Sequence, residues 1–515
     1  MARKLQFKLP FDQDLEAYLT KTYPELVDFH LVSKSLDARG AGRGKKPVFH
    51  YNIDAIWPNE SFDSFNENIE KKKPLSDTPV IVGAGPAGLF CALRLLEYGI
   101  PSIILERGAP ANDRMKHIAR FWRYGEFDDD NNVCYGEGGA GLFSDGKLIT
   151  RVKSPLIKYV MRRLVDFGAP EEILYESNPH LGSNKIRGLI SKLTERLVQG
   201  GCSIQYHAKV EGILFNNKQA VGVRLSGGKT INSSQVILAT GHSAHQIYED
   251  LLDSNVEMKR KDFSVGVRVE HSRREMDQMQ FGNFAGHPAL GTARYRLSYH
   301  DKSNERGTYS FCMCPGGYVL SSGTEADGIV VNGMSNFSRN SPWSNAALVV
   351  TVKSDQDLSS KDLLAGARFQ KEIEQRAFKL SKKHADSRGV PAQTIQQFME
   401  GKSPEIKGVK TSCPSGVFSQ ELDQVLPDFI SKQLREALQV FERQIPGFIS
   451  KNGLLLAPET RTSAPIQIKR DKLTLESTSH RGFYPCGEGA GHAGGITSAA
   501  IDGINVADQM IAKYF

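Results

Sequence analysis

The sequence predicts an α/β fold in which short buried strands end in glycine turns at three widely separated places in the chain. Three glycine-rich motifs support this prediction: GAGPAG at residues 83–88, ATG at 239–241 and GEGAGHAGG at 487–495. Each motif follows a short apolar run, as expected where buried strands end in tight turns. A chain of 515 residues exceeds one hydrophobic core. We therefore also expect a small N-terminal α+β domain and an inserted domain of mixed β-sheet and helix.

Changes in pattern along the chain give the boundaries that we expect. Residues 1–75 alternate as strands around one amphipathic helix and form the small α+β domain. Residues 76–250 carry the first and second segments of the main domain, residues 251–470 form the inserted substrate or cap domain, and residues 471–515 return to the main domain. The polar stretch NENIEKKKPLSD, residues 66–77, is typical of a linker.

The first motif lies between the apolar run PVIV and the amphipathic stretch LFCALRLLEYG. Its glycines have separate tasks in a dinucleotide-binding βαβ unit. Gly83 makes a tight turn, Gly85 admits a pyrophosphate close to the backbone, and Gly88 lets the helix pack on the strand. The N-terminus of the helix then faces the phosphates with its positive end. The sequence therefore predicts a dinucleotide site at this turn, with Pro86 and Ala87 as further contacts.

An acidic residue stands at the place where such a unit binds a ribose. Glu106 ends the second apolar run, IPSIILE, about 20 residues after the motif, where a carboxylate accepts hydrogen bonds from ribose hydroxyls. Arg107 follows it directly and is a candidate contact. We expect both residues at the cofactor.

A second match to the glycine pattern, GEGGAG at residues 136–141, has a different context. Neither a buried strand precedes it nor a helix follows it, so it is not a second βαβ turn. Such a loop is either a cluster of turns or a close approach of the backbone to a ligand. We favour the close approach, through Gly138 and Gly139, because the loop follows a dinucleotide unit.

Together, these motifs resemble those of the glutathione-reductase-type two-dinucleotide flavoprotein superfamily. More narrowly, the chain is similar to a bacterial family of uncharacterised FAD-dependent dehydrogenases. That similarity rests on GEGGAGLFSDGKL (136–148), PHLGSNKI (179–186), FSVGVRVEH (263–271), SFCMCPGG (310–317) and ETRTSAP (459–465). The resemblance implies FAD as the cofactor and a Rossmann-like FAD-binding domain assembled from separated segments.

The resemblance also gives the closing segment a role. In the superfamily the last strand of the FAD domain ends in Gly-Asp or Gly-Glu, and a glycine turn and a helix follow. This implies that Gly487 and Glu488 lie by the pyrophosphate and ribitol. It implies that Gly494, Gly495 and Ile496 begin a helix pointing at the flavin pyrimidine edge, where a helix N-terminus stabilises negative charge. Further FAD-binding candidates are the strand residue Val210 and the motif residues Ala239, Thr240 and Gly241.

Four residues are candidates for the chemistry itself. Cys312 and Cys314 are either two thiols that pass electrons to a flavin or small hydrophobic residues on one face of a strand. On an extended strand their Cα atoms would lie ~6.6 Å apart, which disfavours a disulfide without a turn. Arg461 has the planar fork that binds a carboxylate or phosphate. His492 is a proton donor near the flavin or a packing ring.

The inserted domain must supply the substrate side. Lys147 and His180 lie in segments of the narrower resemblance and are either cavity residues or structural ion-pair and capping residues; Cys486 is expected in the core. One GxGxxG alone has a βαβ context, so NAD(P)H or a protein electron donor would act without a dedicated domain. The arrangement suits hydroxylase-like flavoproteins with a small organic substrate.

Composition excludes several other classes. Hydrophobic residues make up 40% and charged residues 24%, as in globular enzymes, and no apolar run approaches the ~20 residues that span a bilayer. No secretory signal is recognisable. Seven cysteines without a CxxC pair argue against a disulfide framework and structural zinc, so we expect no metal and a cytoplasmic setting. The net charge of +7 is modest, and nucleic acid is not an expected partner.

Three functions remain open at this stage. We favour an FAD-dependent oxidoreductase, a dehydrogenase acting at flavin N5 on an organic substrate. The first alternative is a flavoprotein that binds or acts on RNA through the basic loop at residues 39–46, although a solvated hairpin is the preferred interpretation of that loop. The second alternative is an electron-transfer flavoprotein that serves a protein partner.

Overall fold

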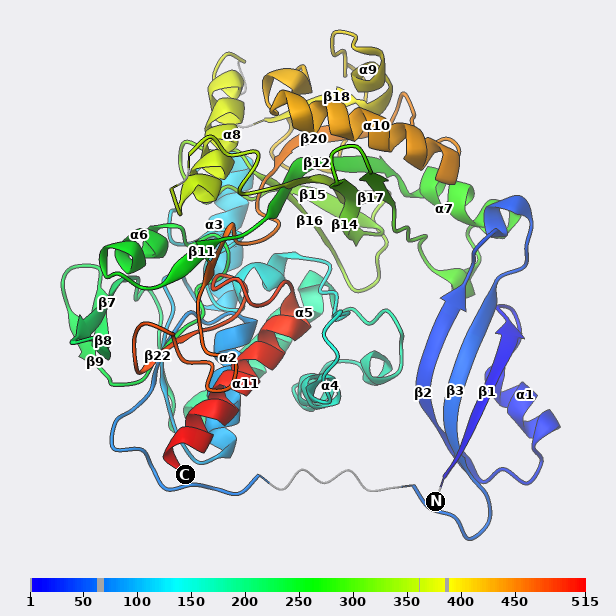
Figure 1. The fold of residues 1–515 in the computed structure, drawn as a ribbon. Coiled ribbons are helices and arrows are strands. Elements are labelled where there is room, and N and C mark those ends of the chain that lie inside the picture. The colour runs from blue at the N-terminus through cyan, green and yellow to red at the C-terminus, as the bar shows by residue number, and fades with distance from the viewer. Residues whose placement is uncertain (1, 63–68, 361, 385–388) are drawn as a thin grey trace.

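The computed structural model describes residues 2–62, 69–360, 362–384 and 389–515. The chain has the mixed α/β fold that the sequence predicts, with separate sheets for the N-terminal, main and inserted parts (Figure 1). Part of the predicted linker, residues 66–68, lies outside the described residues. Within the described ranges, none of the helices combines the length and apolar character needed to cross a membrane.

The N-terminal part is a three-stranded antiparallel sheet in the order β1-β3-β2, covered by one helix. Leu19, Ile53 and Ala55 form its buried core. The sheet stands beside the rest of the molecule in Figure 1 and is joined to it by backbone hydrogen bonds of Lys34 with Tyr175 and Ser177. The elements are β1 (Arg3–Pro10), α1 (Leu15–Thr22), β2 (Asp28–Asp37) and β3 (Val48–Ile56).

The loop between β2 and β3 differs in one respect from the predicted solvated hairpin. Its lysines and arginines are exposed, but Ala41 is fully buried. A Cβ at Gly42 would lie 2.6 Å from the carbonyl oxygen of Met279 in α7 (Arg273–Phe281). The loop tip therefore packs on the inserted part, because a short turn of 3-10 helix (Ala41–Arg43) brings small residues against that helix.

The main part is built on a five-stranded parallel sheet in the order β22-β10-β4-β5-β6. Its central strands are buried on both faces and are therefore short and apolar throughout. The strands are β4 (Val80–Val82), β5 (Ile103–Leu105), β6 (Ser203–Gln205), β10 (Val236–Leu238) and β22 (Phe483–Pro485). The helices are α2 (Pro86–Glu97), α3 (Ala111–Tyr124), α4 (Leu156–Asp166), α5 (Gly182–Gln199) and α11 (Ile496–Tyr514).

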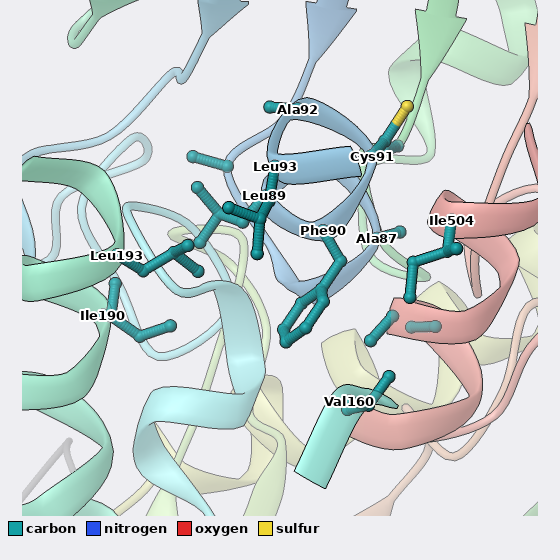
Figure 2. Packing of buried hydrophobic residues seen from close by; sticks show 14 of the residues in the cluster. Ala87, Leu89, Phe90, Cys91, Ala92, Leu93, Val160, Ile190, Leu193 and Ile504 are labelled. Atoms are coloured by element: carbon teal, nitrogen blue, oxygen red, sulfur yellow. The ribbon is translucent and has the colours of Figure 1, made fainter. Parts of the chain in front are cut away.

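Helix α2 is almost completely buried between other helices. Leu89, Phe90 and Leu93 face Ile190 and Leu193 of α5 in the core that Figure 2 shows. On its other side α11 approaches so closely that a Cβ at Gly503 would lie 2.1 Å from the carbonyl oxygen of Ala87. This contact joins the first and the last segment of the main part.

A three-stranded antiparallel sheet extends the main part: β7 (Val210–Asn216), β8 (Gln219–Leu225) and β9 (Thr230–Asn232), with α6 (Gln246–Asp253) after β10. The chain enters and leaves the inserted part side by side. β11 (Met258–Arg260) and β21 (Ile466–Ile468) pair as an antiparallel ribbon at this crossing. The two connections therefore form one junction.

The inserted part is a seven-stranded mixed sheet in the order β13-β14-β17-β12-β20-β18-β19. Helices cover it at the top of Figure 1, where α10 lies along the strands. The strands are β12 (Phe263–Ser272), β13 (Ser298–Asp301), β14 (Arg306–Cys314), β17 (Trp343–Val352), β18 (Val390–Thr394), β19 (Val417–Ser419) and β20 (Leu454–Glu459). The helices are α7 (Arg273–Phe281), α8 (Ala365–Ser381), α9 (Ile395–Glu400) and α10 (Asp428–Gln444), and β15 (Gly317–Ser321) pairs with β16 (Val331–Ser335).

Candidate functional site

The carboxyl ends of β4, β5 and β10 open into a cavity of about 780 Å³. β4 has β5 on one side and β10 on the other, which is where ligands bind in open α/β sheets. The opposite side of the cavity is formed by strands of the inserted part. Among the FAD-binding candidates, the cavity is lined by Gly83, Gly85, Pro86, Ala87, Glu106, Arg107, Gly139, Val210, Ala239, Thr240, Gly241, Glu488, Gly494, Gly495 and Ile496.

The glycines of the first motif are required for two different reasons. Gly83 has φ +107°, and a Cβ there would lie 2.4 Å from the carbonyl oxygen of Ala239. A Cβ at Gly88 would lie 2.0 Å from the carbonyl oxygen of Gly83. Gly85 is different, because the nearest atom to its added Cβ is the Cα of Gly139, 4.0 Å away. Protein packing therefore requires Gly83 and Gly88, whereas Gly85 keeps open a space in the cavity.

The same contrast recurs at the start of α11. Gly494 has no protein atom within 4 Å of an added Cβ. Gly495 has φ +152° and precedes the first residue of α11, Ile496. Gly85 and Gly494 thus both leave space in one cavity, each beside a helix N-terminus. This is the cradle that an elongated ligand with negative charge requires.

Three candidate glycines lie behind the cavity wall. Gly88 packs α2 on its strand, as described above. The amide of Gly138 donates to the carbonyl of Ala84 (2.8 Å), and that of Gly487 donates to Asp502 (2.7 Å). These residues position the lining loops and are absent from the lining itself.

Glu106 is held by backbone donors. Its carboxylate accepts hydrogen bonds from the amides of Ala84 (2.8 Å), Gly108 (3.0 Å) and Gly136 (2.9 Å). It is 5% exposed and lines the cavity. The carboxylate therefore ties both glycine loops together, a task beyond the ribose contact that its spacing predicts. Its neighbour Arg107 stacks on the ring of Tyr135 at 4.0 Å.

Arg114 of α3 was not foreseen from the sequence. It is fully buried, and its guanidinium donates to the carbonyls of Asn132, Val133, Glu137 and Gly139 at 2.7–3.1 Å. Burial lowers its pKa to about 10. Arg114 therefore shapes the second glycine loop from behind. No local pattern could have revealed it, because its partners follow it by 18–25 residues.

Glu488 lies at the α11 end of the cavity. Burial raises the pKa of its carboxyl to about 7, and the positive charge of Lys261 opposes this shift only in part. Lys261 itself donates to the carbonyl of Gly491 (3.2 Å). A carboxyl group that changes its protonation near neutral pH therefore lies beside the proposed ribitol position.

A buried ion pair forms the floor on the inserted side. Arg268 of β12 binds Glu459 of β20 through two hydrogen bonds of 2.7 and 2.6 Å. The same guanidinium donates to the carbonyl of Cys312 (3.1 Å) and to the side chains of Asn332 (3.2 Å) and Asn345 (3.0 Å). Glu459, Cys312 and Asn332 line the cavity. Sequence reasoning singled out the segments that contain Arg268 and Glu459 but did not assign these two residues.

Lys147 belongs to a second buried network. Asp145 is fully buried and pairs with Lys147 (2.8 Å) and Arg339 (2.5 Å). These two cations lower the pKa of the Asp145 carboxyl despite its burial. Lys147 also donates to the carbonyl of Met313 and lines the cavity. His180 stays behind the wall, where its Nε2 lies 2.9 Å from the carbonyl oxygen of Phe337.

Two other candidates are engaged by protein partners. Arg461 forms a two-pronged pair with Glu374 (2.7 and 2.7 Å), and its remaining nitrogen donates to His245 (2.7 Å). It reaches the cavity with its charge already neutralised. His492 lies outside the cavity lining, and its Nε2 is 2.9 Å from the carbonyl oxygen of Ile468. Cys486 is fully buried.

Cys312 and Cys314 are brought together at the end of β14. Cys312 lines the cavity, whereas Cys314 is fully buried behind it. The Cys314 thiol lies 3.4 Å from the carbonyl oxygen of Cys312. Among the described residues, no group of three or more His, Cys, Asp or Glu side chains is placed to hold a metal ion.

Comparisons with known proteins identify the cofactor. Residues 77–117 match the family described as "FAD binding domain", and residues 262–462 match "FAD-dependent protein, C-terminal domain-like". A protein of Clostridium beijerinckii, described as uncharacterized, is 40% identical over 464 residues, which cover 90% of this chain and 85% of that protein. The chain belongs to this family of FAD-dependent proteins. The cofactor of this FAD-dependent protein is FAD, as the sequence predicts.

Comparison with solved structures gives matches of low similarity. The flavin-dependent brominase Bmp2 matches with a TM-score of 0.37 and 11% identity, over 85% of this chain and 81% of that one. The GidA protein of Aquifex aeolicus matches with 0.36 and 12%, over 85% and 64%. CtdE in complex with FAD matches with 0.30 and 12%, over 85% and 84%. These scores are too low to transfer a substrate, and membership of the glutathione-reductase-type superfamily stays a prediction.

Proposed function

We propose that this FAD-dependent protein is an oxidoreductase of the dehydrogenase type, which transfers a hydride or an electron pair between flavin N5 and a small organic substrate. One observation carries the proposal. A single cavity joins the glycine loops of the main part to a polar floor on the inserted sheet. A flavin held by the loops would face that floor, and the cavity volume of about 780 Å³ lies in the range of ligand and cofactor pockets.

In this proposal the chain's own residues hold the two ends of FAD. The space at Gly85 and the N-terminus of α2 receive the pyrophosphate, with Glu106 toward the ribose. The space at Gly494 and the N-terminus of α11 receive the pyrimidine edge, where the positive helix end favours the reduced flavin. FAD supplies the redox chemistry, and the protein supplies orientation and charge.

The substrate would lie against Lys147, Asn332 and Glu459. The side chain of Lys147 is 29% exposed. Burial lowers the pKa of Lys147, but the charges of Asp145, Cys314 and Cys312 together raise it above its ordinary value, so the ammonium persists. An ammonium and an amide suit a carbonyl or hydroxyl oxygen of an organic substrate. The network behind Lys147 fixes its position, which orients such a group without a further rearrangement.

The test measures flavin reduction in the purified holoenzyme without oxygen. Panels of alcohols, amines, organic acids, NADH and NADPH are mixed with the wild type, and the visible flavin absorbance is followed. We expect at least one organic donor to bleach the flavin. Lys147→Met should slow that reaction about tenfold or more, equivalent to ~1.4 kcal/mol of transition-state stabilisation, and should retain FAD.

The matched control is Lys158→Met, on the exposed face of α4 and outside the cavity. It should react like the wild type. A protein without FAD, or a flavin that none of these donors reduces, would overturn the dehydrogenase proposal. Reduction by a protein donor alone would favour the electron-transfer alternative instead.

A further inference from the structure

The two cysteines of β14 lie at a break in the strand. β14 pairs with β17 in register up to Phe311 and Ala347, and pairing resumes at Cys314 and Asn345. Two residues of β14 therefore face one of β17, which is a β-bulge. Within the bulge Cys312 has φ +44°, a left-handed conformation that residues other than glycine seldom adopt. The bulge replaces the extended geometry that would keep the two cysteines apart.

The bulge places the two cysteines beside each other and separates their roles. Cys314 is fully buried, and its sulfur lies 3.4 Å from the carbonyl oxygen of Cys312. The interaction of the two thiols lowers the pKa of Cys312 and raises that of Cys314. Cys312 alone faces the cavity. An accessible sulfur with thiolate character in front of a buried protonated one is the arrangement of a nucleophilic and a resolving cysteine.

Two cations secure this arrangement. Arg268 donates to the carbonyl of Cys312 (3.1 Å), and Lys147 donates to the carbonyl of Met313. Their charges also lower the pKa of Cys312. Two small hydrophobic residues would need neither a left-handed backbone nor cations that bind the carbonyls of Cys312 and Met313. The groups that bind the backbone around the left-handed Cys312 therefore also favour a thiolate there.

The thiol pair lies within the candidate FAD site. Cys312 lines the same cavity as Glu488 and Ile496, and its charge contributes to the raised pKa of the Glu488 carboxyl. The pair is therefore close to the end of the cavity that we assign to the flavin ring. No partner domain is needed to bring thiol and cavity together.

We propose that Cys312 and Cys314 form a dithiol–disulfide couple that exchanges an electron pair with FAD and reduces small organic disulfides. This inference rests on the proposed oxidoreductase function and specifies its substrate class. The bulge, the exposed and the buried sulfur, and the shared cavity carry it.

The chemistry balances in three steps. The Cys312 thiolate attacks one sulfur of the substrate disulfide, the substrate S–S bond breaks, and one thiolate leaves and takes a proton. Cys314 then loses its proton and attacks the Cys312 sulfur, the second substrate thiolate leaves and is protonated, and the Cys312–Cys314 bond forms. The disulfide finally receives two electrons and two protons from FAD in its reduced form. A reduced nicotinamide, or dithionite in the experiment, supplies the electrons to FAD.

The first test counts electrons in the oxidised holoenzyme. It is treated with oxidised lipoamide, freed of excess reagent, and titrated with dithionite without oxygen. Wild type should take up about twice the electron equivalents per FAD that Cys312→Ser or Cys314→Ser takes up, because disulfide and flavin each accept two electrons. Cys202→Ser removes a buried cysteine outside the cavity and should behave like the wild type.

The second test locates the bond and the turnover. Alkylation followed by mass spectrometry should find a 312–314 disulfide after lipoamide treatment and two alkylated thiols after reduction. Oxidised lipoamide should reoxidise the dithionite-reduced wild type. It should reoxidise Cys312→Ser much more slowly, although both proteins retain FAD. A normal flavin titration with equal uptake in wild type and both serine variants would overturn the dithiol couple. Loss of FAD or an irreducible flavin in the wild type would instead overturn the proposed function.

Discussion

The cavity wall formed by the main part and the wall formed by the inserted part differ in the groups that they present. The main wall is backbone: glycine turns after β4 and β10, the loop at residues 136–141 and the N-termini of α2 and α11. The inserted wall rests on buried ion pairs whose members lie far apart in sequence. Arg268 and Glu459 are 191 residues apart, and Asp145 of the main part binds Arg339 of the inserted part, 194 residues later.

This difference shows what each wall can do. Backbone amides and helix ends present fixed partial charges, which suit a cofactor that is the same in many proteins. Paired side chains give a shaped polar surface that changes with single substitutions, which suits a substrate. The two walls should therefore respond differently to mutation.

The largest effect is expected from breaking the Arg268–Glu459 pair. Arg268→Met leaves the Glu459 carboxylate buried without its partner, which should cost about 3–5 kcal/mol of folding free energy. Urea unfolding of the holoenzyme measures it. Combining Arg268→Met with Glu459→Leu should recover part of the loss, because no charge then remains buried. Lys469→Met, which breaks a half-exposed pair with Glu257, should change stability little. Equal losses of folding free energy in Arg268→Met and Lys469→Met would contradict the importance of the buried pair.

Next in size is Glu106→Ala in the backbone wall. Three buried amides lose their acceptor, so we expect about 2–3 kcal/mol of destabilisation together with loss of FAD on dialysis. Glu106→Gln should retain an intermediate fraction of FAD, since its amide oxygen still accepts. If Glu106→Ala unfolds like the wild type and loses only FAD, the carboxylate serves the ribose alone.

A pH effect should follow from Glu488. Its carboxyl pKa is raised to about 7 in the folded protein, so its contribution to stability is complete below the unfolded pKa of about 4.3 and is lost as pH rises through about 7. Relative to Glu488→Gln, the wild-type apoprotein should lose about 1–3 kcal/mol between about pH 5 and pH 8. Thermal unfolding of both proteins across this range provides the measurement. Parallel curves would show that Glu488 titrates as it does in the unfolded chain.

The smallest effect is expected at Gly494. An alanine there meets no protein atom within 4 Å, so the apoprotein should keep its stability while its FAD dissociation constant rises about fivefold, or ~1 kcal/mol. Equilibrium titration with FAD gives the constant. Gly188→Ala on α5, where an added Cβ also meets nothing, should leave FAD binding unchanged. A wild-type affinity in Gly494→Ala would remove FAD from that end of the cavity.

The same difference between the two walls explains which features could be predicted from the sequence. The turn at Gly83, the strand ends and the start of α11 follow local patterns, because glycine position and apolar runs depend on neighbouring residues. Arg114 could not be found in this way, since a buried guanidinium that binds backbone carbonyls leaves no spacing rule. The bulge at Cys312 was also hidden, because alternation alone predicts a regular strand. Long-range pairs are specified only when the fold brings them together.

The order of segments in the main sheet determines when the FAD-binding domain can be completed during synthesis of the chain. β22 and α11 are made after the whole inserted part, yet β22 pairs with β10 and α11 packs on α2. On a ribosome, residues 80–238 must wait with an open sheet edge and an uncovered helix until residues 483–514 emerge. Meanwhile the inserted sheet can fold as a unit between the adjacent strands β11 and β21. Loading of the cofactor is therefore expected to be post-translational, so that starvation for riboflavin would leave completed chains with an empty cleft.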